Sequence, residues 1–140
     1  MPPLVEDLMA DDPIAIGVDA SVRDAGTRLY EAAVGSLIVT SEKDVPVGIV
    51  TSTDVFRVMA ETDASLSEIS VSEYMSRPLL TVEADAPIRR AVRRMNEEEV
   101  EQLAIVEDYD VIGVLSRGDV IDAYEDLIKA AHVAERQPES

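Results

Sequence analysis

The chain has 140 residues, no cysteine and a formal net charge of −17, from 29 acidic and 12 basic residues. Without cysteine it forms no disulfide, thiolate nucleophile or cysteine–zinc site, and its negative charge disfavours binding to nucleic-acid backbones. No apolar run approaches the length of a membrane span, and the opening residues lack a secretory signal pattern, so we expect a cytoplasmic protein with no membrane partner.

The first of two sequence repeats spans residues 5–55. Short apolar runs predict its strands, and apolar residues at helical spacing predict an amphipathic helix whose N-cap is Ser21. The expected elements in chain order are a helical turn at 5–9, a strand at 14–18, a helix at 21–34, strands at 36–40 and 45–50, and a helix at 52–61.

The second repeat spans residues 71–120 and has the same order of apolar runs and turns. Pro87 suits the first position of its amphipathic helix, because the missing N–H is not needed there. The expected elements are a helical turn at 71–75, a strand at 79–83, a helix at 87–100, strands at 102–106 and 111–115, and a helix at 117–134. Four methionines on apolar faces are expected in the core: Met9, Met59, Met75 and Met95.

The repeats predict a mixed α/β (α+β) fold in which each repeat reads strand, helix, strand, strand, helix. We expect a first repeat at 1–66, a second at 67–134 and a disordered tail at 135–140. A unit of about 55 residues cannot bury both faces of its sheet alone. The repeats should therefore pack through their sheets about a pseudo-twofold axis, with two equivalent clefts between them.

One motif occurs in both repeats, as Gly48-Ile-Val-Thr-Ser-Thr-Asp54 and Gly113-Val-Leu-Ser-Arg-Gly-Asp119. Each predicts a buried strand that runs directly into a helix, with Thr51 or Ser116 as N-cap and the aspartate in the first turn. The exposed N–H groups of such a junction suit an anion. A single copy would be explained by helix capping alone, but the duplication favours a pair of binding sites.

Together with the spacing from Met9 to Pro13 and from Met75 to Pro78, these motifs resemble a tandem pair of cystathionine β-synthase (CBS) domains, a Bateman module. The resemblance covers nearly the whole chain. It implies a stand-alone, non-catalytic regulatory module that binds AMP, ADP or ATP, with S-adenosylmethionine or dinucleotides as further ligands. It also implies a homodimer, a regulated partner protein, and neither a cofactor nor a metal.

The resemblance also implies roles for individual residues. Thr51 and Ser116 would donate to a phosphate, Asp54 and Asp119 would accept from ribose hydroxyls, and backbone groups of the early strand and the helix-to-strand corner would hold the base. The first site would comprise Ile14, Ile16, Val18, Gly35, Ser36, Leu37, Thr51 and Asp54. The second would comprise Leu80, Thr81, Val82, Glu101, Gln102, Leu103, Ser116, Arg117 and Asp119.

The two expected sites differ in charge. Arg117 follows the hydroxyl residue of the second site, where Ser52 stands in the first, and an arginine offers a bidentate phosphate contact. We therefore rank the second site above the first. Glu101 opposes this ranking, because it stands where the first site has Gly35 and would crowd or repel a ligand.

Arg89, Arg90, Arg93 and Arg94 form the one basic cluster of the sequence. Glu97 and Glu98 follow Arg93 and Arg94 by four residues, so helix-surface ion pairs are the favoured interpretation. The alternatives are a docking face for an acidic partner and a phosphate clamp.

Two other function classes compete with ligand sensing. The first is a structural dimerisation or protein-interaction module whose ligand sites are vestigial. The second is an enzyme such as a nucleotide hydrolase, which ranks last because the sequence has no Gly-x4-Gly-Lys loop and only His132 as a histidine.

The excess of acidic residues, with only Lys43 and Lys129 as lysines, predicts a protein of a salt-accumulating organism. Self-repulsion destabilises so acidic a fold in dilute buffer, whereas about 1 M KCl shortens the screening length to about 3 Å. We expect the melting temperature to rise between dilute buffer and molar KCl. A melting temperature that stays level or falls would indicate an ordinary acidic protein instead.

Overall fold

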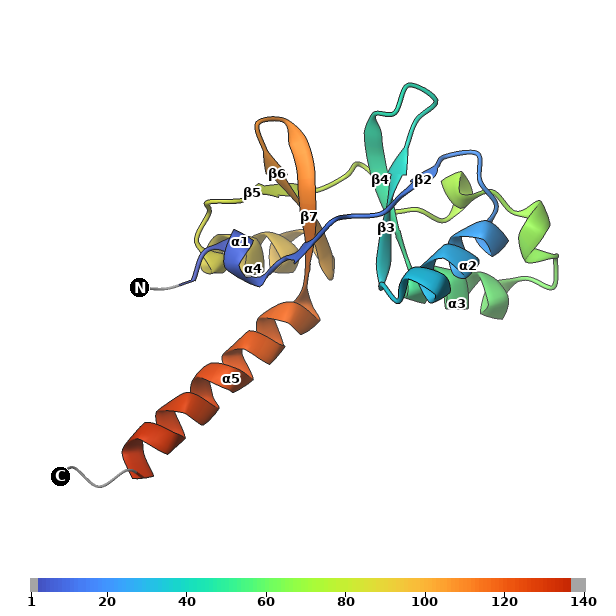
Figure 1. Ribbon diagram of the computed structural model, residues 1–140. Helices are drawn as coiled ribbons and strands as arrows, with labels where there is room; N and C mark the ends of the chain where they lie inside the picture. The colour runs from blue at the N-terminus through green and yellow to red at the C-terminus, as the bar shows by residue number, and fades with distance from the viewer. Residues whose placement is uncertain (1–2, 137–140) are drawn as a thin grey trace. The chain divides into compact units, whose positions relative to one another are not determined.

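A computed structural model describes the backbone of residues 3–136 and the side chains of residues 3–126 (Figure 1). The chain forms two compact units. Unit 1 combines Met1–Asp11 with Val82–Ser140, and unit 2 is Asp12–Thr81. Within the described part of the chain, no helix has both the length and the apolar character needed to cross a membrane.

Unit 2 is a three-stranded sheet covered by two helices. Its strand order is β2-β3-β4, with β2 parallel and β4 antiparallel to β3. Its core is formed by apolar side chains of the sheet and of α2 and α3, including Val22, Leu29, Leu37, Val50 and Val58. The elements are β2 (Ala15–Gly17), α2 (Val22–Ala32), β3 (Ser36–Thr40), β4 (Pro46–Thr51), α3 (Ser52–Glu61) and the 3-10 turns η1 (Leu66–Glu68) and η2 (Val71–Glu73).

Unit 1 repeats this plan around a four-stranded sheet with the order β1-β7-β6-β5. Ala91 and Met95 of α4 and Leu103, Ile105 and Leu115 of the sheet are almost completely buried. The elements are α1 (Val5–Leu8), β1 (Ala10–Asp11), β5 (Thr81–Glu83), α4 (Ile88–Glu98), β6 (Gln102–Glu107), β7 (Asp110–Ser116) and α5 (Arg117–Arg136).

The compact units do not coincide with residues 1–66 and 67–134, because each unit contains the opening segment of the other repeat. In unit 1, β1 pairs antiparallel with β7, so that Ala10 faces Val114. In unit 2, Ser76 forms an antiparallel bridge with Ile49 of β4. In both units the segment from the other repeat pairs with the strand that would otherwise form an open sheet edge.

The glycine of each motif lies where this added segment crosses the sheet. A Cβ atom on Gly48 would lie 2.7 Å from the backbone oxygen of Ser76, and one on Gly113 would lie 2.7 Å from that of Ala10. These distances are shorter than real Cβ atoms allow. Both glycines are therefore explained by close packing of backbone on backbone.

The predicted elements are largely confirmed, including the strand at 36–40, the helix at 52–61 and the Ser21 N-cap, whose hydroxyl accepts from the Asp24 N–H. The expectation that Pro87 occupies the first helical position is wrong. Pro87 is the N-cap, with an extended ψ of 147°, and the helix begins at Ile88. The turn at 71–75 is a 3-10 helix over Val71–Glu73, and strand β1 was not predicted.

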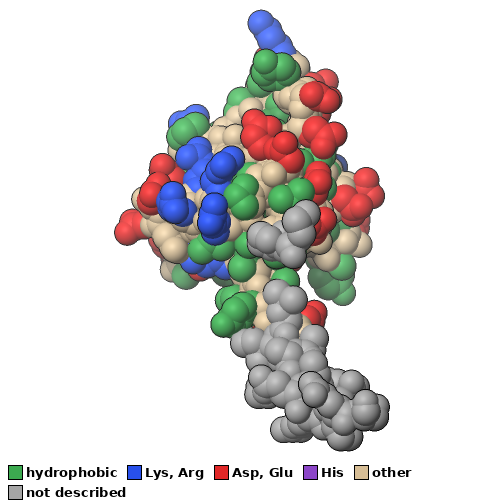
Figure 2. All heavy atoms as spheres, turned by 90° about the vertical axis from the view of Figure 1, so that its left-hand side faces the viewer, with side chains coloured by type: hydrophobic (Ala, Val, Ile, Leu, Met, Phe, Trp, Pro, Cys, Tyr) green, Lys and Arg blue, Asp and Glu red, His purple; other side chains and the backbone are tan. Residues whose placement is uncertain are grey.

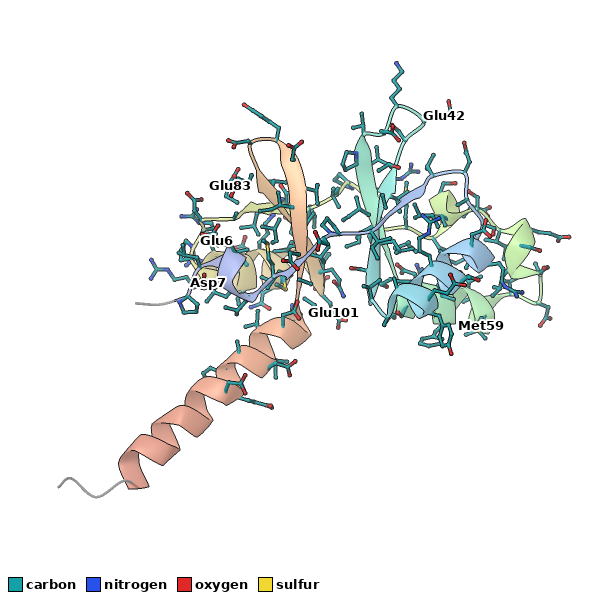
Figure 3. The ribbon with its side chains drawn as sticks, viewed as in Figure 1. Glu6, Asp7, Glu42, Met59, Glu83 and Glu101 are labelled. Atoms are coloured by element: carbon teal, nitrogen blue, oxygen red, sulfur yellow. The ribbon has the colours of Figure 1, made fainter. Side chains whose placement is uncertain are left out.

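Two further expectations need correction. Met95 is buried as predicted, but Met59 is 58% exposed, because Val55 and Val58 form the buried side of α3. Figure 3 marks its position on that helix. The expected tail at 135–140 begins too early, since α5 continues to Arg136, and residues 137–140 lie outside the described part of the chain.

Candidate functional site

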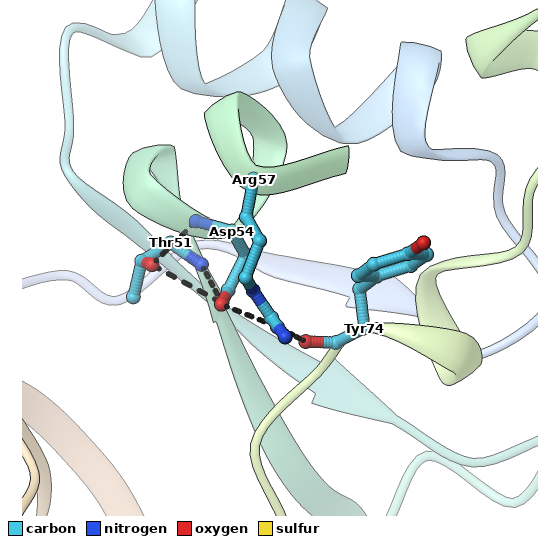
Figure 4. A network of polar contacts seen from close by, with 4 residues as sticks. All are labelled: Thr51, Asp54, Arg57 and Tyr74. Carbon is cyan, nitrogen blue, oxygen red and sulfur yellow. Dashed lines mark hydrogen bonds and ion pairs between the residues drawn. The ribbon is translucent and has the colours of Figure 1, made fainter. Parts of the chain in front are cut away.

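The junction of β4 and α3 carries the first copy of the motif. Thr51 is the last residue of the strand and the N-cap of the helix, so its hydroxyl accepts from the Asp54 N–H at 3.2 Å. The Asp54 carboxylate in turn accepts from the Thr51 N–H at 2.9 Å and from the Thr51 hydroxyl at 3.1 Å (Figure 4). This is a complete capping box, and it fixes both predicted site residues in place.

Asp54 is also held by a cation. Arg57 Nη2 lies 3.3 Å from Asp54 Oδ1 and donates to the Tyr74 backbone oxygen at 3.2 Å. Its guanidinium lies 5.2 Å from the centroid of the Tyr74 ring, within the range of a cation–π contact (Figure 4). Asp54 is only 9% exposed, and both of its carboxylate oxygens already accept hydrogen bonds. A ribose would have to share this carboxylate or displace Arg57.

The junction of β7 and α5 repeats the capping box without the cation. Asp119 Oδ2 accepts from the Ser116 N–H at 2.9 Å, and the Ser116 hydroxyl accepts from the Asp119 N–H at 3.0 Å. Asp122 stands where α3 has Arg57. Among the residues whose side chains are described, none donates to Asp119 Oδ1, so this carboxylate retains an acceptor oxygen for a ligand.

The helix-to-strand corner lies beside each junction, the place that the family resemblance implies for it. The Ser52 N–H donates to the Gly35 oxygen at 3.1 Å, and the Arg117 N–H donates to the Glu101 oxygen at 3.0 Å. The strand register also matches, with Ser36 opposite Thr51 and Gln102 opposite Ser116. The structure thus brings together residues 35–36 with 51–54, and residues 101–102 with 116–119.

The early strand contributes less to the first junction. The Ile38 N–H donates to the Ile14 oxygen at 2.8 Å, whereas Val18 lies at the other end of the pairing, beside Thr40. Of the three predicted positions, only Ile14 therefore lies near the corner. The side chains of Ile16 and Leu37 are buried in the core of unit 2, which leaves only their backbone for a ligand.

The second site shows the same pattern, because the side chains of Val82 and Leu103 are buried. Leu80, Thr81 and Gln102 are half-buried, and Glu101, immediately before β6, is exposed (Figure 3). Arg117 is half-buried and lines an apolar hollow of about 170 Å³ between α4 and α5, formed with Val92, Met95, Val120 and Ile121. Its phosphate contact remains a prediction.

A hollow of about 280 Å³ in unit 2 was not predicted from the sequence. It lies between β2 and the polar face of α2, and its charged lining residues recur every three or four positions along that helix. In the sequence, this spacing indicates that the charged side chains share one face of the helix. Arg28 of this lining donates to the Ala15 oxygen, so its guanidinium also fixes the sheet edge. The lining residues are Ile16, Gly17, Ala20, Asp24, Thr27, Arg28 and Glu31.

Replacing Thr51 with alanine is expected to lower the free energy of unfolding by about 1 kcal/mol, because the Asp54 N–H loses its side-chain acceptor. Urea unfolding measures this change. Thr53→Ala is the control, since Thr53 is exposed in the same helix and should change stability by less than about 0.5 kcal/mol. Equal losses in the two variants would contradict the capping role.

Comparison with known proteins identifies both repeats. The sequence model of the CBS domain matches residues 5–61 and 71–126. An uncharacterized protein of Methanopyrus kandleri is 29% identical over 72% of this chain and 52% of its own length. The L-aspartate semialdehyde sulfurtransferase of Methanosarcina acetivorans is 29% identical over 84% of this chain but only 23% of the enzyme. The chain thus spans about half of the first relative and about a quarter of the second.

A solved structure shows the same fold. It is a CBS domain pair crystallised in complex with 5′-methylthioadenosine and S-adenosyl-L-methionine, with a TM-score of 0.77 and 24% sequence identity. The match covers 90% of this chain and 98% of that one. The mixed α and β architecture with two small sheets therefore matches that of a solved CBS domain pair.

Proposed function

Since this chain belongs to the CBS domain family, we propose that it is a regulatory module that binds an adenosyl ligand and catalyses no reaction. The ligand is AMP, ADP or ATP, with S-adenosylmethionine as the next candidate. The related domain pair in complex with 5′-methylthioadenosine and S-adenosyl-L-methionine supports the adenosyl class.

The observation that carries the proposal is that two junctions share the same capping-box construction. In each, a hydroxyl and a carboxylate three residues apart are held by a capping box at the start of a helix. The carboxylate accepts hydrogen bonds without donating any, which suits the paired hydroxyls of a ribose. The backbone of the neighbouring corner, at Gly35 or Glu101, supplies amide groups for the base.

The second junction is the stronger binding site in this proposal. Asp119 keeps an acceptor oxygen that no described side chain or backbone group uses, whereas Asp54 is engaged by Arg57. A ligand that binds at the first junction must compete with the Arg57–Asp54 ion pair and with the Arg57–Tyr74 contacts. We therefore expect two affinities, with the tighter one at Ser116 and Asp119.

Regulation follows from differential affinity. A ligand that binds one arrangement of the chain better than another shifts the population toward that arrangement, and only by as much as the two affinities differ. A partner protein that recognises one arrangement would then respond to the ligand concentration.

Isothermal titration in high salt with AMP, ADP, ATP, S-adenosylmethionine and 5′-methylthioadenosine tests the proposal. We expect heat and a higher melting temperature with at least one of them. Product analysis after incubation with ATP should show no turnover. Neither heat nor a melting shift with any of the five compounds would overturn the proposal.

A second candidate function is a structural interaction module, and exposed apolar side chains of unit 2 favour it. Tyr30 on α2 is 87% exposed, and Phe56 on α3 is 66% exposed. A dimer or a partner would remove this apolar surface from water. If this is the function, Phe56→Ser combined with Met59→Ser should dissociate the assembly in light scattering, while adenosyl compounds should leave its mass and melting temperature unchanged.

A further inference from the structure

Among the residues whose side chains are described, the most basic surface is the outer side of α4. Four of the twelve basic residues lie within six positions of this helix, and three of them, Arg89, Arg90 and Arg93, are exposed. Figure 2 shows Lys and Arg side chains gathered on the side of the molecule where α4 lies, bordered by acidic ones. We call Arg89, Arg90, Arg93 and Arg94 the arginine face.

The ion pairs predicted for the arginine face do not form. Among the residues whose side chains are described, the one ion pair joins Arg57 to Asp54, so neither Arg93–Glu97 nor Arg94–Glu98 is present. The reason is the order of the charges. Helical side chains lean toward the N-terminus, so an arginine points away from a glutamate four residues later.

Without a bound anion, the arginine face therefore destabilises the fold through repulsion between like charges. Arg89 and Arg93, like Arg90 and Arg94, are like charges four residues apart on one helix, which is a destabilising arrangement. The first turn of α4 contains no acidic residue. Arg94 Nε is the one side-chain nitrogen or oxygen in the described region that is buried without a hydrogen-bond partner. Nothing described within the chain explains why these charges are kept together.

The shape of the surface adds a place for an anion. Arg89, Arg90 and Arg93 line a hollow of about 140 Å³ together with Pro87. Guanidinium groups bind phosphate oxygens in pairs, with fixed planar geometry. The equivalent helix of unit 2 has no such cluster, because Asp24 and Thr27 stand where α4 has Arg90 and Arg93.

We propose that the arginine face is a binding site for a compact polyphosphate anion, distinct from the adenosyl junctions. The net charge of −17 repels an extended polyanion, whose charges reach beyond the four arginines, more than it repels a compact one. A pyrophosphate or triphosphate group places several charges inside the hollow and meets mainly the local positive field. The arginine face would thus bind a second kind of ligand, either a free polyphosphate anion or the phosphate group of a larger molecule.

Titration with inorganic pyrophosphate, without adenosine, tests this site separately from the proposed function. We expect pyrophosphate to bind more tightly than inorganic phosphate. The double variant Arg90→Gln/Arg93→Gln should weaken pyrophosphate binding about ten- to a hundredfold, because charge-assisted hydrogen bonds are lost. Its melting temperature without ligand should stay equal or rise, since like-charge repulsion is relieved; a structural role would lower it.

The control is Arg23→Gln/Arg77→Gln, which removes the same charge from exposed positions in unit 2. It should leave pyrophosphate binding nearly unchanged, and binding of 5′-methylthioadenosine, which has no phosphate, should be equal in both double variants. The proposal is overturned if pyrophosphate fails to bind or if the two double variants weaken it equally. It is also overturned if Asp119→Asn abolishes pyrophosphate binding, or if only an acidic peptide binds the arginine face. Failure of every adenosyl compound would instead overturn the proposed function alone.

Discussion

Asp119→Asn is expected to weaken the binding of 5′-methylthioadenosine by about ten- to a hundredfold, because a ribose would lose hydrogen bonds to a charged acceptor. The asparagine keeps one side-chain oxygen for the Ser116 N–H, so the capping contact at 2.9 Å can persist. Stability should therefore change much less than affinity. Isothermal titration gives the affinity and urea unfolding gives the stability.

The matched control is Asp122→Asn, one turn further along α5, where the aspartate is exposed and belongs to no capping box. It removes the same charge and should leave the affinity within about twofold of the unmodified protein, as expected for a screened surface charge. If the two variants weaken binding equally, the effect is one of net charge, and the role of Asp119 in holding the ribose is wrong.

Gly113→Ala is expected to lower the free energy of unfolding by about 1–3 kcal/mol, the usual cost of forcing an extra carbon into a packed site. Its Cβ would lie 2.6 Å from Met9 Sδ and 2.7 Å from the Ala10 oxygen, so β1 would have to move away from β7. Gly48→Ala should have a similar effect, through Ser76 and Met75. Chemical unfolding measures both losses.

Gly17→Ala is the control for this pair. A Cβ on Gly17 meets no atom within 4 Å, and the residue lies in an ordinary strand conformation. Stability should stay level or rise by about 0.4–1 kcal/mol, because alanine restricts the unfolded chain. If Gly17→Ala lowers the free energy of unfolding as much as Gly113→Ala does, any glycine within a strand is sensitive to substitution. The close approach of β1 and of Ser76 would then not explain the losses.

Local chemistry explains why the elements could be predicted so closely. The caps at Ser21, Thr51 and Ser116 each join groups three residues apart, so a short window of sequence contains both partners. The repeat then provides a second reading of most of the predicted elements. The candidate site shares this local character, since each hydroxyl, its aspartate and their spacing belong to one strand-to-helix junction.

Contacts between residues far apart in the chain could not be predicted in this way. Arg57 donates to the backbone oxygen of Tyr74, 17 positions away in the chain. The motif alone therefore does not reveal that Arg57 is positioned to pair with Asp54. The ion pairs predicted for α4 failed because spacing alone does not include the direction in which helical side chains lean. The exposure of Met59 likewise depends on which side of α3 faces the sheet.

By itself, the sequence determined the family, the order of strands and helices and the twin capping boxes, because those features rest on apolar periodicity and on hydrogen bonds within one turn. Only the tertiary structure decided that the opening segment of each repeat completes the sheet of the other, and that one aspartate is engaged by an arginine while its counterpart keeps an open acceptor. Such pairings depend on which distant backbones come within hydrogen-bonding distance. A motif of seven residues contains no information about that distance.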